Sequence, residues 1–234
     1  MKTVVVTGCD WGLGAEIAKR GLADGWRVFA GCLNPVKSPA MKELAKAYGN
    51  RLTVLRMDMS SEASIRRAAA AIRRNVRRLD LLVNNAGIFW NDGPEKVNAR
   101  DFQRMFAVNA IGPAVLIREL LRPLRAAKGR IINVSSEAGS IGAVANARPI
   151  IAYGASKAAL NMIMRRLSFM LARDGVYTIS IHPGWMRTPM GRAGGGDPTQ
   201  EPSDTARDVF KLAAKLDRKM TGRFFIHDGT PYPW

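Results

Sequence analysis

The chain has 234 residues, of which 47% are hydrophobic and 24% are charged. Lysine and arginine outnumber aspartate and glutamate by 36 to 19, so the net charge is +17. No apolar run reaches 18 residues, which argues against a membrane span. Two cysteines, Cys9 and Cys32, provide no disulfide framework and no CxxC metal pair, so we expect a cytoplasmic protein with no bound metal.

Strand-like and helix-like segments alternate along the sequence. Apolar runs predict strands at 3–7, 27–32, 52–56, 80–84, 130–134, 177–182 and 223–226. Periodic patterns predict helices at 13–24, 39–48, 61–77, 98–109 continuing to 125, 152–172 and 203–217. Such alternation is typical of an α/β fold, here a Rossmann-like, doubly wound parallel sheet flanked by helices. We expect one domain over 1–234, with the glycine- and proline-rich stretch 191–202 as a mobile substrate flap.

The basic charge has two explanations. Arginines gather at 66–78 and at 122–130, and such charge attracts nucleic acid or anionic lipid. The other explanation is a solvated helix face, because Ile65, Ala69 and Ile72 form an apolar stripe that leaves the arginines outside.

A glycine-rich turn follows the first predicted strand and opens the first helix. It reads Thr7-Gly8-Cys9-Asp10-Trp11-Gly12-Leu13-Gly14. Glycines allow a tight turn and let a pyrophosphate approach the amides at the positive end of a helix. The turn therefore predicts a dinucleotide site at Gly8, Gly12, Leu13 and Gly14.

Tyr153 and Lys157 lie four residues apart, on one face of a predicted helix. A phenol titrates near pH ~10, and bringing that value to about 7 requires roughly 4 kcal/mol. An ammonium about 4 Å away supplies up to about 4 kcal/mol at an effective dielectric near 20. Lys157 is therefore expected nearly to suffice for making Tyr153 an acid or base near neutral pH.

Together with the turn and the Tyr-x3-Lys pair, four further motifs carry a family resemblance. They are Asn84-Asn85-Ala86-Gly87, Asn109, Asn133-Val134-Ser135-Ser136 and Pro183-Gly184. The chain resembles the short-chain dehydrogenases/reductases over essentially its full length. Within the family, the chain resembles the sniffer-like carbonyl reductases and bacterial C-signal proteins. The resemblance lies in residues 156–162, His182–Trp185, Met190-Gly191 and Pro233-Trp234.

The resemblance implies an NAD(P)-dependent oxidoreductase acting on a carbonyl compound or a secondary alcohol. Tyr153 is then the acid/base, Ser136 binds the substrate oxygen, Lys157 also bonds the nicotinamide ribose, and Asn109 anchors a proton-relaying water. Seventeen positions separate Ser136 from Tyr153, more than the family's usual gap, so we expect an insertion at 137–152. Ser140 competes with Ser136 by spacing, and the Asn-Val-Ser-Ser context favours Ser136.

The resemblance also implies a cofactor site at the ends of several strands. The adenine contact is expected at Asp58 and Met59, and the ribose passes Asn85, Ala86 and Gly87. The nicotinamide segment is expected at Pro183, Gly184, Met186 and Thr188, with Thr188 bonding the carboxamide. His182 is interpreted as a structural histidine at the end of a strand.

The choice between NAD and NADP is left open by the residues. Family members that prefer NADP often have arginine where this chain has Trp11 or Leu33, and the carboxylate typical of NAD enzymes is replaced by Cys32. Asp10 is placed to repel a 2′-phosphate, and Lys37 to attract one. The subgroup resemblance tilts the prediction slightly to NADP.

Hydrophobic residues near the motifs predict an apolar substrate pocket. The candidate wall residues are Phe89, Trp90, Ile141, Val144, Trp185, Met186 and Met190. Two predicted helices, 98–125 and 152–172, have long apolar faces. The second face includes Leu160, Ile163, Leu167 and Leu171. Such faces suggest a homodimer or homotetramer, or else burial within one chain.

The alternative function is a dinucleotide-binding signalling or sensor protein with little turnover.

Overall fold

The computed structural model describes residues 1–145 and 147–234. Seven parallel strands form one sheet in the order β3-β2-β1-β4-β5-β6-β7. The strands are β1 (Thr3–Thr7), β2 (Arg27–Cys32), β3 (Leu52–Arg56), β4 (Leu81–Asn84), β5 (Arg130–Val134), β6 (Tyr177–His182) and β7 (Phe224–Ile226). The predicted doubly wound sheet is confirmed, and five of the strands have the predicted bounds.

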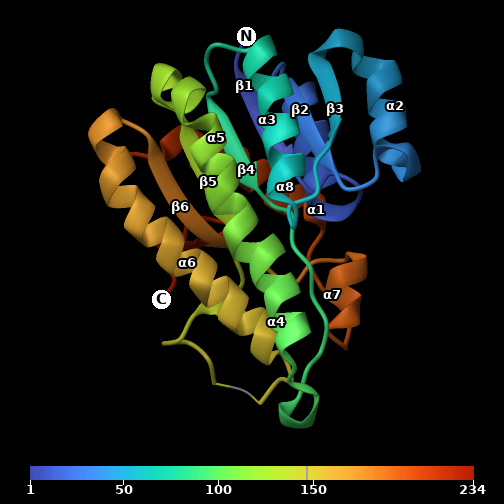
Figure 1. Ribbon diagram of the computed structural model, residues 1–234, viewed down its shortest axis with the longest axis vertical. Helices are drawn as coiled ribbons and strands as arrows, with labels where there is room; N and C mark the ends of the chain where they lie inside the picture. Colours follow the sequence, from blue (N-terminus) through green and yellow to red (C-terminus); the bar gives the residue numbers. More distant parts are fainter. Residues whose placement is uncertain (146) are drawn as a thin grey trace.

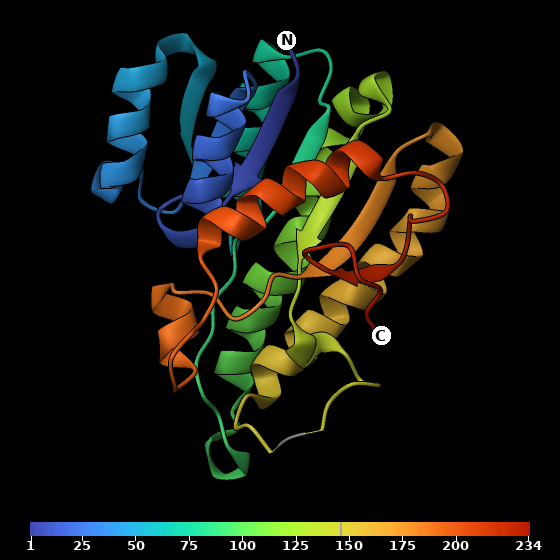
Figure 2. The same cartoon turned by 180° about the vertical axis from the view of Figure 1, so that it is seen from behind.

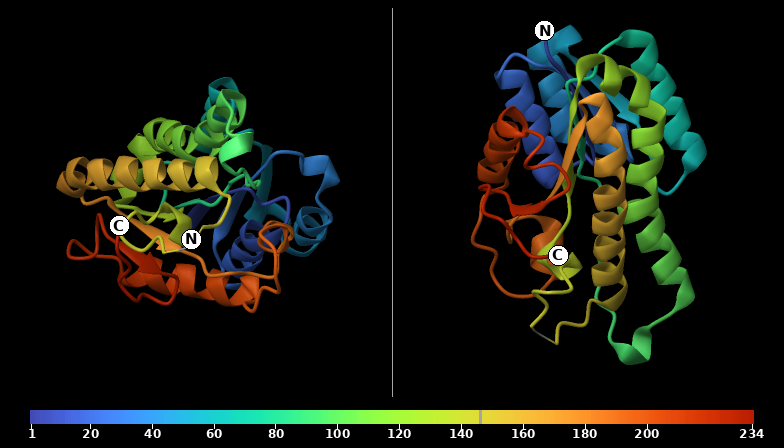
Figure 3. Two further views of the ribbon diagram at one scale, coloured as in Figure 1. Left: turned by 90° about the horizontal axis from the view of Figure 1, so that it is seen from below. Right: turned by 90° about the vertical axis from the view of Figure 1, so that its left-hand side faces the viewer.

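Helices cover both faces of the sheet (Figures 1 and 2). They are α1 (Gly12–Ala23), α2 (Pro39–Tyr48), α3 (Glu62–Asn75), α4 (Ala99–Phe106), α5 (Gly112–Ala127), α6 (Ile151–Leu171), α7 (Pro189–Ala193) and α8 (Pro202–Lys215). One core cluster joins the sheet to α1 and α8, and the other joins it to α3, α5 and α6. The layers are visible in Figure 3, where α6 and the red α8 lie on opposite sides of the sheet.

The predicted helix from 98 to 125 is interrupted by a π-helical turn at Ala107–Ile111 between α4 and α5. Such turns occur often at functional sites. This one presents the buried Asn109 to the turn after β4.

Long apolar side chains on α6 pack against the core of the same chain. Leu160 and Leu171 are buried, and Ile163 and Leu167 pack against the same core cluster. Burial within one chain therefore explains this face, and association into a dimer or tetramer stays a prediction. Within the described ranges, no helix is long and apolar enough to cross a membrane.

The carboxyl ends of the parallel strands point to one edge of the sheet, the lower edge in Figure 1. The glycine turn, the segment after β5, the start of α6 and the loop carrying α7 all gather there. Ligands of open α/β sheets bind at this edge.

Candidate active site

Tyr153 and Lys157 both lie on the first turns of α6. Lys157 is 3% exposed, and its Nζ atom donates to the backbone oxygen of Val134 at 2.8 Å. The same Nζ lies 5.8 Å from the centre of the Tyr153 ring. Burial lowers the pKa of Lys157 to about 8.

The phenol of Tyr153 is not acidified by the protein alone. Burial raises its pKa to about 12, a hydrogen bond with Ser136 lowers it in part, and the negative charge of Glu137 raises it further. The expectation that Lys157 nearly suffices to bring the phenol to neutral pH is therefore wrong. The physical reason is that desolvation of the buried phenolate is the largest influence on this pKa, and Lys157 is not among the groups that lower it.

Ser136 and Ser140 have different surroundings. Ser136 follows β5, contacts the Tyr153 hydroxyl, and accepts a bond from the Ala138 amide at 3.2 Å. Ser140 is fully buried, donates to the oxygen of Pro233 at 2.8 Å, and accepts from the Ala143 amide at 3.1 Å. Ser136 thus lies beside Tyr153, whereas Ser140 ties the loop after β5 to the C-terminal segment.

Asn109 is paired with the backbone of Ile88. Its Oδ1 accepts from the Ile88 amide at 2.9 Å, and its Nδ2 donates to the Ile88 oxygen and to Ser156 Oγ, both at 3.0 Å. A Cβ added to Gly87 would lie 3.4 Å from Asn109 Oδ1 and 3.6 Å from Lys157 Nζ. Both side chains therefore converge on Gly87. Ser156, to which the sequence analysis assigned no role, accepts from Asn109 and donates in turn to the backbone oxygen of Tyr153 at 2.7 Å.

The glycine turn has the geometry that a dinucleotide needs. Gly8 and Gly12 have φ of 71° and 60°, and a Cβ at Gly8 would lie 2.7 Å from the Cα of Ala86. Trp11 stands at the N-cap of α1, and its side chain makes no capping bond. The first amides of this 12-residue helix can therefore serve an anionic ligand, and the residues fit a pyrophosphate.

Leu13 and Gly14 lie in the first turn of α1 and are buried. The end of β4 is tied to the turn by Asn85. Its Nδ2 donates to the oxygens of Thr7 and Gly8 at 2.9 and 3.3 Å, while Thr7 Oγ1 accepts from the amides of Asn85 and Ala86 at 3.0 Å. Asn85 therefore supports the turn with its side chain, and Ala86 and Gly87 form the small surface beside it.

The two residues expected at the adenine are also placed near this edge. Asp58 Oδ1 accepts from the amide and the hydroxyl of Ser60, at 2.9 and 2.7 Å. Met59 is buried and belongs to the core cluster that includes α3 and α5. Asp58 keeps its second carboxylate oxygen for a further donor.

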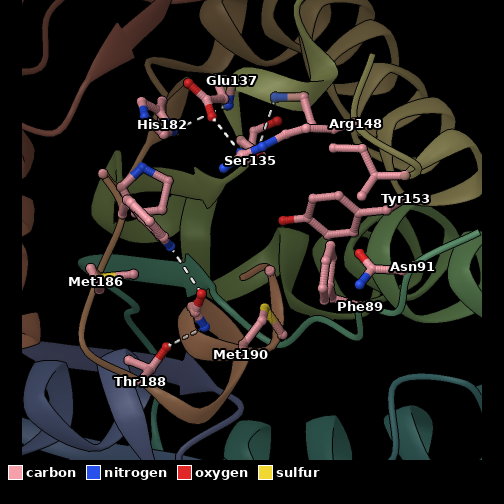
Figure 4. Close-up of a pocket in the computed structure, with 18 of the residues that line it drawn as sticks. Phe89, Asn91, Ser135, Glu137, Arg148, Tyr153, His182, Met186, Thr188 and Met190 are labelled. Carbon is pink, nitrogen blue, oxygen red and sulfur yellow. Dashed lines mark hydrogen bonds and ion pairs between the residues drawn. The ribbon is translucent and has the colours of Figure 1, made fainter. Parts of the chain in front are cut away.

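Pro183, Gly184, Met186 and Thr188 line a cavity of about 140 Å³ together with Ser136 and Tyr153 (Figure 4). Thr188 Oγ1 accepts from the Gly191 amide at 3.0 Å and so caps α7. Behind this segment, Thr205 Oγ1 donates to the Pro183 oxygen at 2.9 Å. Thr205 and its neighbour Gln200 had no signal in the sequence.

Four of the predicted hydrophobic wall residues line this cavity, namely Phe89, Trp185, Met186 and Met190. Ile141 and Val144 instead line a neighbouring hollow of about 570 Å³, and Trp90 lines neither. Residue 146 of the predicted insertion lies outside the described residues.

The cavity is more polar than predicted. Glu137 and Arg148 form an ion pair at 3.2 Å beside it, and the Arg148 guanidinium lies 5.9 Å from the Trp185 ring. The Glu137 amide donates to His182 Nδ1 at 3.1 Å. Burial lowers the pKa of His182, with Glu137 opposing it, which is consistent with a structural histidine.

Comparison with known proteins agrees with this geometry. Residues 2–197 match the family model described as short chain dehydrogenase. C-signal of Myxococcus xanthus is 38% identical, over 67% of this chain and 93% of its own length.

Two solved structures cover all of this chain. The NADPH-bound carbonyl reductase from chicken fatty liver has a TM-score of 0.92 and 30% identity, with 99% of its chain covered. The carbonyl reductase Sniffer of D. melanogaster has a TM-score of 0.92 and 28% identity, with 100% covered. The chain belongs to the short-chain dehydrogenase/reductase family, a family of NAD(P)-dependent oxidoreductases, and its structure is similar to those of carbonyl reductases such as Sniffer.

Proposed function

We propose that this protein reduces a carbonyl compound with NAD(P)H, with Tyr153 as the proton donor. One observation carries the proposal. Ser136 and Tyr153 line one side of a small cavity whose other wall is the segment from Pro183 to Thr188, and the Nζ atom of Lys157 lies 5.8 Å from the centre of the Tyr153 ring. When bound, the nicotinamide dinucleotide supplies the hydride.

Ser136 and Tyr153 act on the substrate oxygen. The raised pKa of the Tyr153 phenol, about 12, keeps its proton in place at neutral pH, as a general acid for reduction requires. Ser136 donates a second hydrogen bond to the same oxygen and so fixes its distance from the phenol.

Lys157 favours the phenolate that remains after the proton has left. Its pKa of about 8 leaves the ammonium mostly charged at pH 7, and its bond to the Val134 oxygen fixes its place. Asn109 fixes the Gly87-Ile88 turn beside that ammonium. Both hydrogens of the Asn109 side-chain amide are used. A relay water bound to this side chain would therefore donate a hydrogen bond to its Oδ1 atom.

The cavity walls favour hydrophobic aldehydes and ketones. Phe89 packs edge-on against Tyr153 with ring centres 5.0 Å apart, and Trp185, Met186 and Met190 complete an apolar lining. The Glu137–Arg148 pair marks its polar rim.

The test is a panel of aldehydes and ketones incubated with the protein and either NADH or NADPH, followed by the loss of absorbance of the reduced nucleotide. Each nucleotide without a carbonyl gives the background. We expect turnover of hydrophobic carbonyls, with the alcohol recovered as product. Nucleotide binding without turnover of any member would overturn the proposal in favour of a sensor protein.

A further inference from the structure

Asp10, in the middle of the glycine turn, holds the loop that follows β2. Its Oδ2 accepts from the Leu33 amide and its Oδ1 from the Asn34 amide, each at 2.8 Å. Its backbone oxygen accepts from Ser38 Oγ at 3.0 Å, and Ser38 also caps α2. Asp10 is 8% exposed, so its carboxylate is a fixed part of the site.

This carboxylate lies at the end of β2, where dinucleotide-binding folds place the acid that reads the adenosine ribose. In this chain the end of β2 carries the Cys32 thiol, and the acid comes from the turn on the neighbouring strand instead. We propose that Asp10 is the specificity residue of the cofactor site and that the protein prefers NAD(H) to NADP(H). The inference reverses the slight tilt to NADP that the subgroup resemblance gave.

The hydrogen-bonding capacity of Asp10 suits a hydroxyl. An ionised carboxylate has about four acceptor positions. Two are used by the Leu33 and Asn34 amides, so each oxygen keeps one for a donor. A ribose 2′-hydroxyl is such a donor.

A 2′-phosphate meets the opposite conditions. A phosphate monoester carries about −1.5 to −2 charges at neutral pH and seeks amide or cationic donors. The two amides at the end of β2 already bond to Asp10, whose own charge repels the phosphate. The negative charge of Asp10 also acts on a neighbouring group. Together with burial, which is the larger cause, it raises the pKa of the Cys32 thiol to about 12.

The side chains of the turn and of the adjoining hollow do not reverse this balance. Trp11 and Leu33, which flank the carboxylate, are uncharged and are 63% and 54% exposed. Lys19 lies 3.9 Å from Glu16, and Arg187 lies 2.8 Å from Glu201, so both cations of the adjoining hollow have acidic partners.

Lys37 is the one cationic residue in the stretch from Leu33 to Ser38, and it is exposed. This stretch therefore offers one exposed ammonium, whereas Asp10 offers a fixed carboxylate that already accepts from the amides of Leu33 and Asn34. The nearby groups therefore favour a free 2′-hydroxyl over a phosphate.

Binding measurements test the inference without any carbonyl substrate. The dissociation constants of NADH and NADPH are measured by titration calorimetry, and we expect NADH to bind at least about tenfold more tightly. In the wild-type protein, 5′-ADP should likewise displace NADH at lower concentration than 2′,5′-ADP. This second comparison isolates the phosphate and needs no variant.

Two variants assign the effect to residues. Asp10→Asn keeps the size and one acceptor oxygen and removes the charge, so the NADH-to-NADPH ratio should fall to about threefold or less. Leu33→Arg adds a cation while leaving Asp10 in place, and it should tighten NADPH binding at least about fivefold. Asp174→Asn, on a surface ion pair with Arg125, is the matched charge control and should leave the ratio unchanged.

Equal or tighter binding of NADPH by the wild type would overturn the inference, and so would an unchanged ratio in a folded Asp10→Asn protein. If that variant does not fold, the comparison of 5′-ADP with 2′,5′-ADP as competitors of NADH in the wild-type protein tests the inference. The inference rests on the proposed function only for the presence of a dinucleotide. NADH binding without carbonyl turnover would remove the proposed function alone, and turnover with NADPH preferred would remove this inference alone.

Discussion

The amide side chain of Gln200 lies directly against the Cα atom of Gly184, where an added Cβ would lie 2.8 Å from Gln200 Cδ. Gln200 Nε2 donates to Thr205 Oγ1 at 2.5 Å and lies 2.9 Å from His227 Nε2. Its backbone oxygen accepts from the Arg187 amide at 2.9 Å. Gln200 thus joins the β7 end of the molecule to the segment expected to hold the nicotinamide.

We therefore predict that Gln200→Ala weakens cofactor binding. Loss of two hydrogen bonds of about 1 kcal/mol each, about 2 kcal/mol together, corresponds to about a 30-fold rise in the cofactor's KM or Kd. The turnover number should change less, because no reacting group is removed. Gln103→Ala, at the exposed second glutamine on α4, is the control. A variant with wild-type cofactor affinity would show that Gln200 only fills space.

The two serines should differ in what their loss affects. Ser136→Ala should lower kcat about 100-fold, because a donor to the substrate oxygen is lost, with little effect on stability. Ser140→Ala should lower the free energy of unfolding by about 1–2 kcal/mol, because the Pro233 oxygen and the Ala143 amide lose their partner. Steady-state kinetics and urea unfolding of both variants check this. The opposite ranking of activities would assign Ser140 to the substrate.

Tyr153→Phe should reduce kcat at least about 100-fold and leave the nucleotide dissociation constant within about twofold, since only the hydroxyl group that donates the proton is removed. Tyr177→Phe is the matched control, because Tyr177 begins β6 and lies at the opposite end of that strand from the site. Comparable rates for wild type and Tyr153→Phe would exclude the phenol as the proton donor.

Most of the fold followed from local patterns. Runs such as Thr3–Thr7 and Tyr177–His182 are rich in buried, β-branched residues between turn signals, so their type and their bounds were both predictable. The π-helical turn at Ala107–Ile111 was not, because a shift of backbone bonding by one residue leaves the apolar spacing almost unchanged. The five-residue α7 was hidden in a stretch of glycine and proline.

Within the site, the residues found from the sequence are those whose chemistry is written in a short motif, such as Tyr153 and Lys157. Arg148 and Gln200 reach the cavity region from irregular segments, and their positions depend on tertiary contacts that no local pattern encodes. The pKa of Tyr153 was mispredicted for a related reason. Charge at a given spacing can be read from the sequence, whereas the extent of burial cannot.

The buried ammonium of Lys157 should lower the free energy of unfolding at neutral pH. Its pKa falls from 10.5 to about 8 on folding because the ammonium is buried, a difference of 10.5 − 8 = 2.5, or about 3 kcal/mol. Below about pH 8 both states carry the proton and the penalty is complete. Between about 8 and 10.5 the unfolded chain binds more protons, so this term raises the stability as the pH rises.

Lys157→Met, of similar volume, removes the buried charge and with it the desolvation penalty. It also removes the bond to the Val134 oxygen, and the loss of this bond offsets about 1 kcal/mol of the gain in stability. We therefore predict that the variant is about 2 kcal/mol more stable than wild type at pH 7, and that the gap narrows by pH 9.5. Urea unfolding at the two pH values measures both quantities. A variant less stable than wild type at pH 7 would mean that the hydrogen bonds of the ammonium outweigh its desolvation. The charge beside Tyr153 would then not lower the stability of the protein.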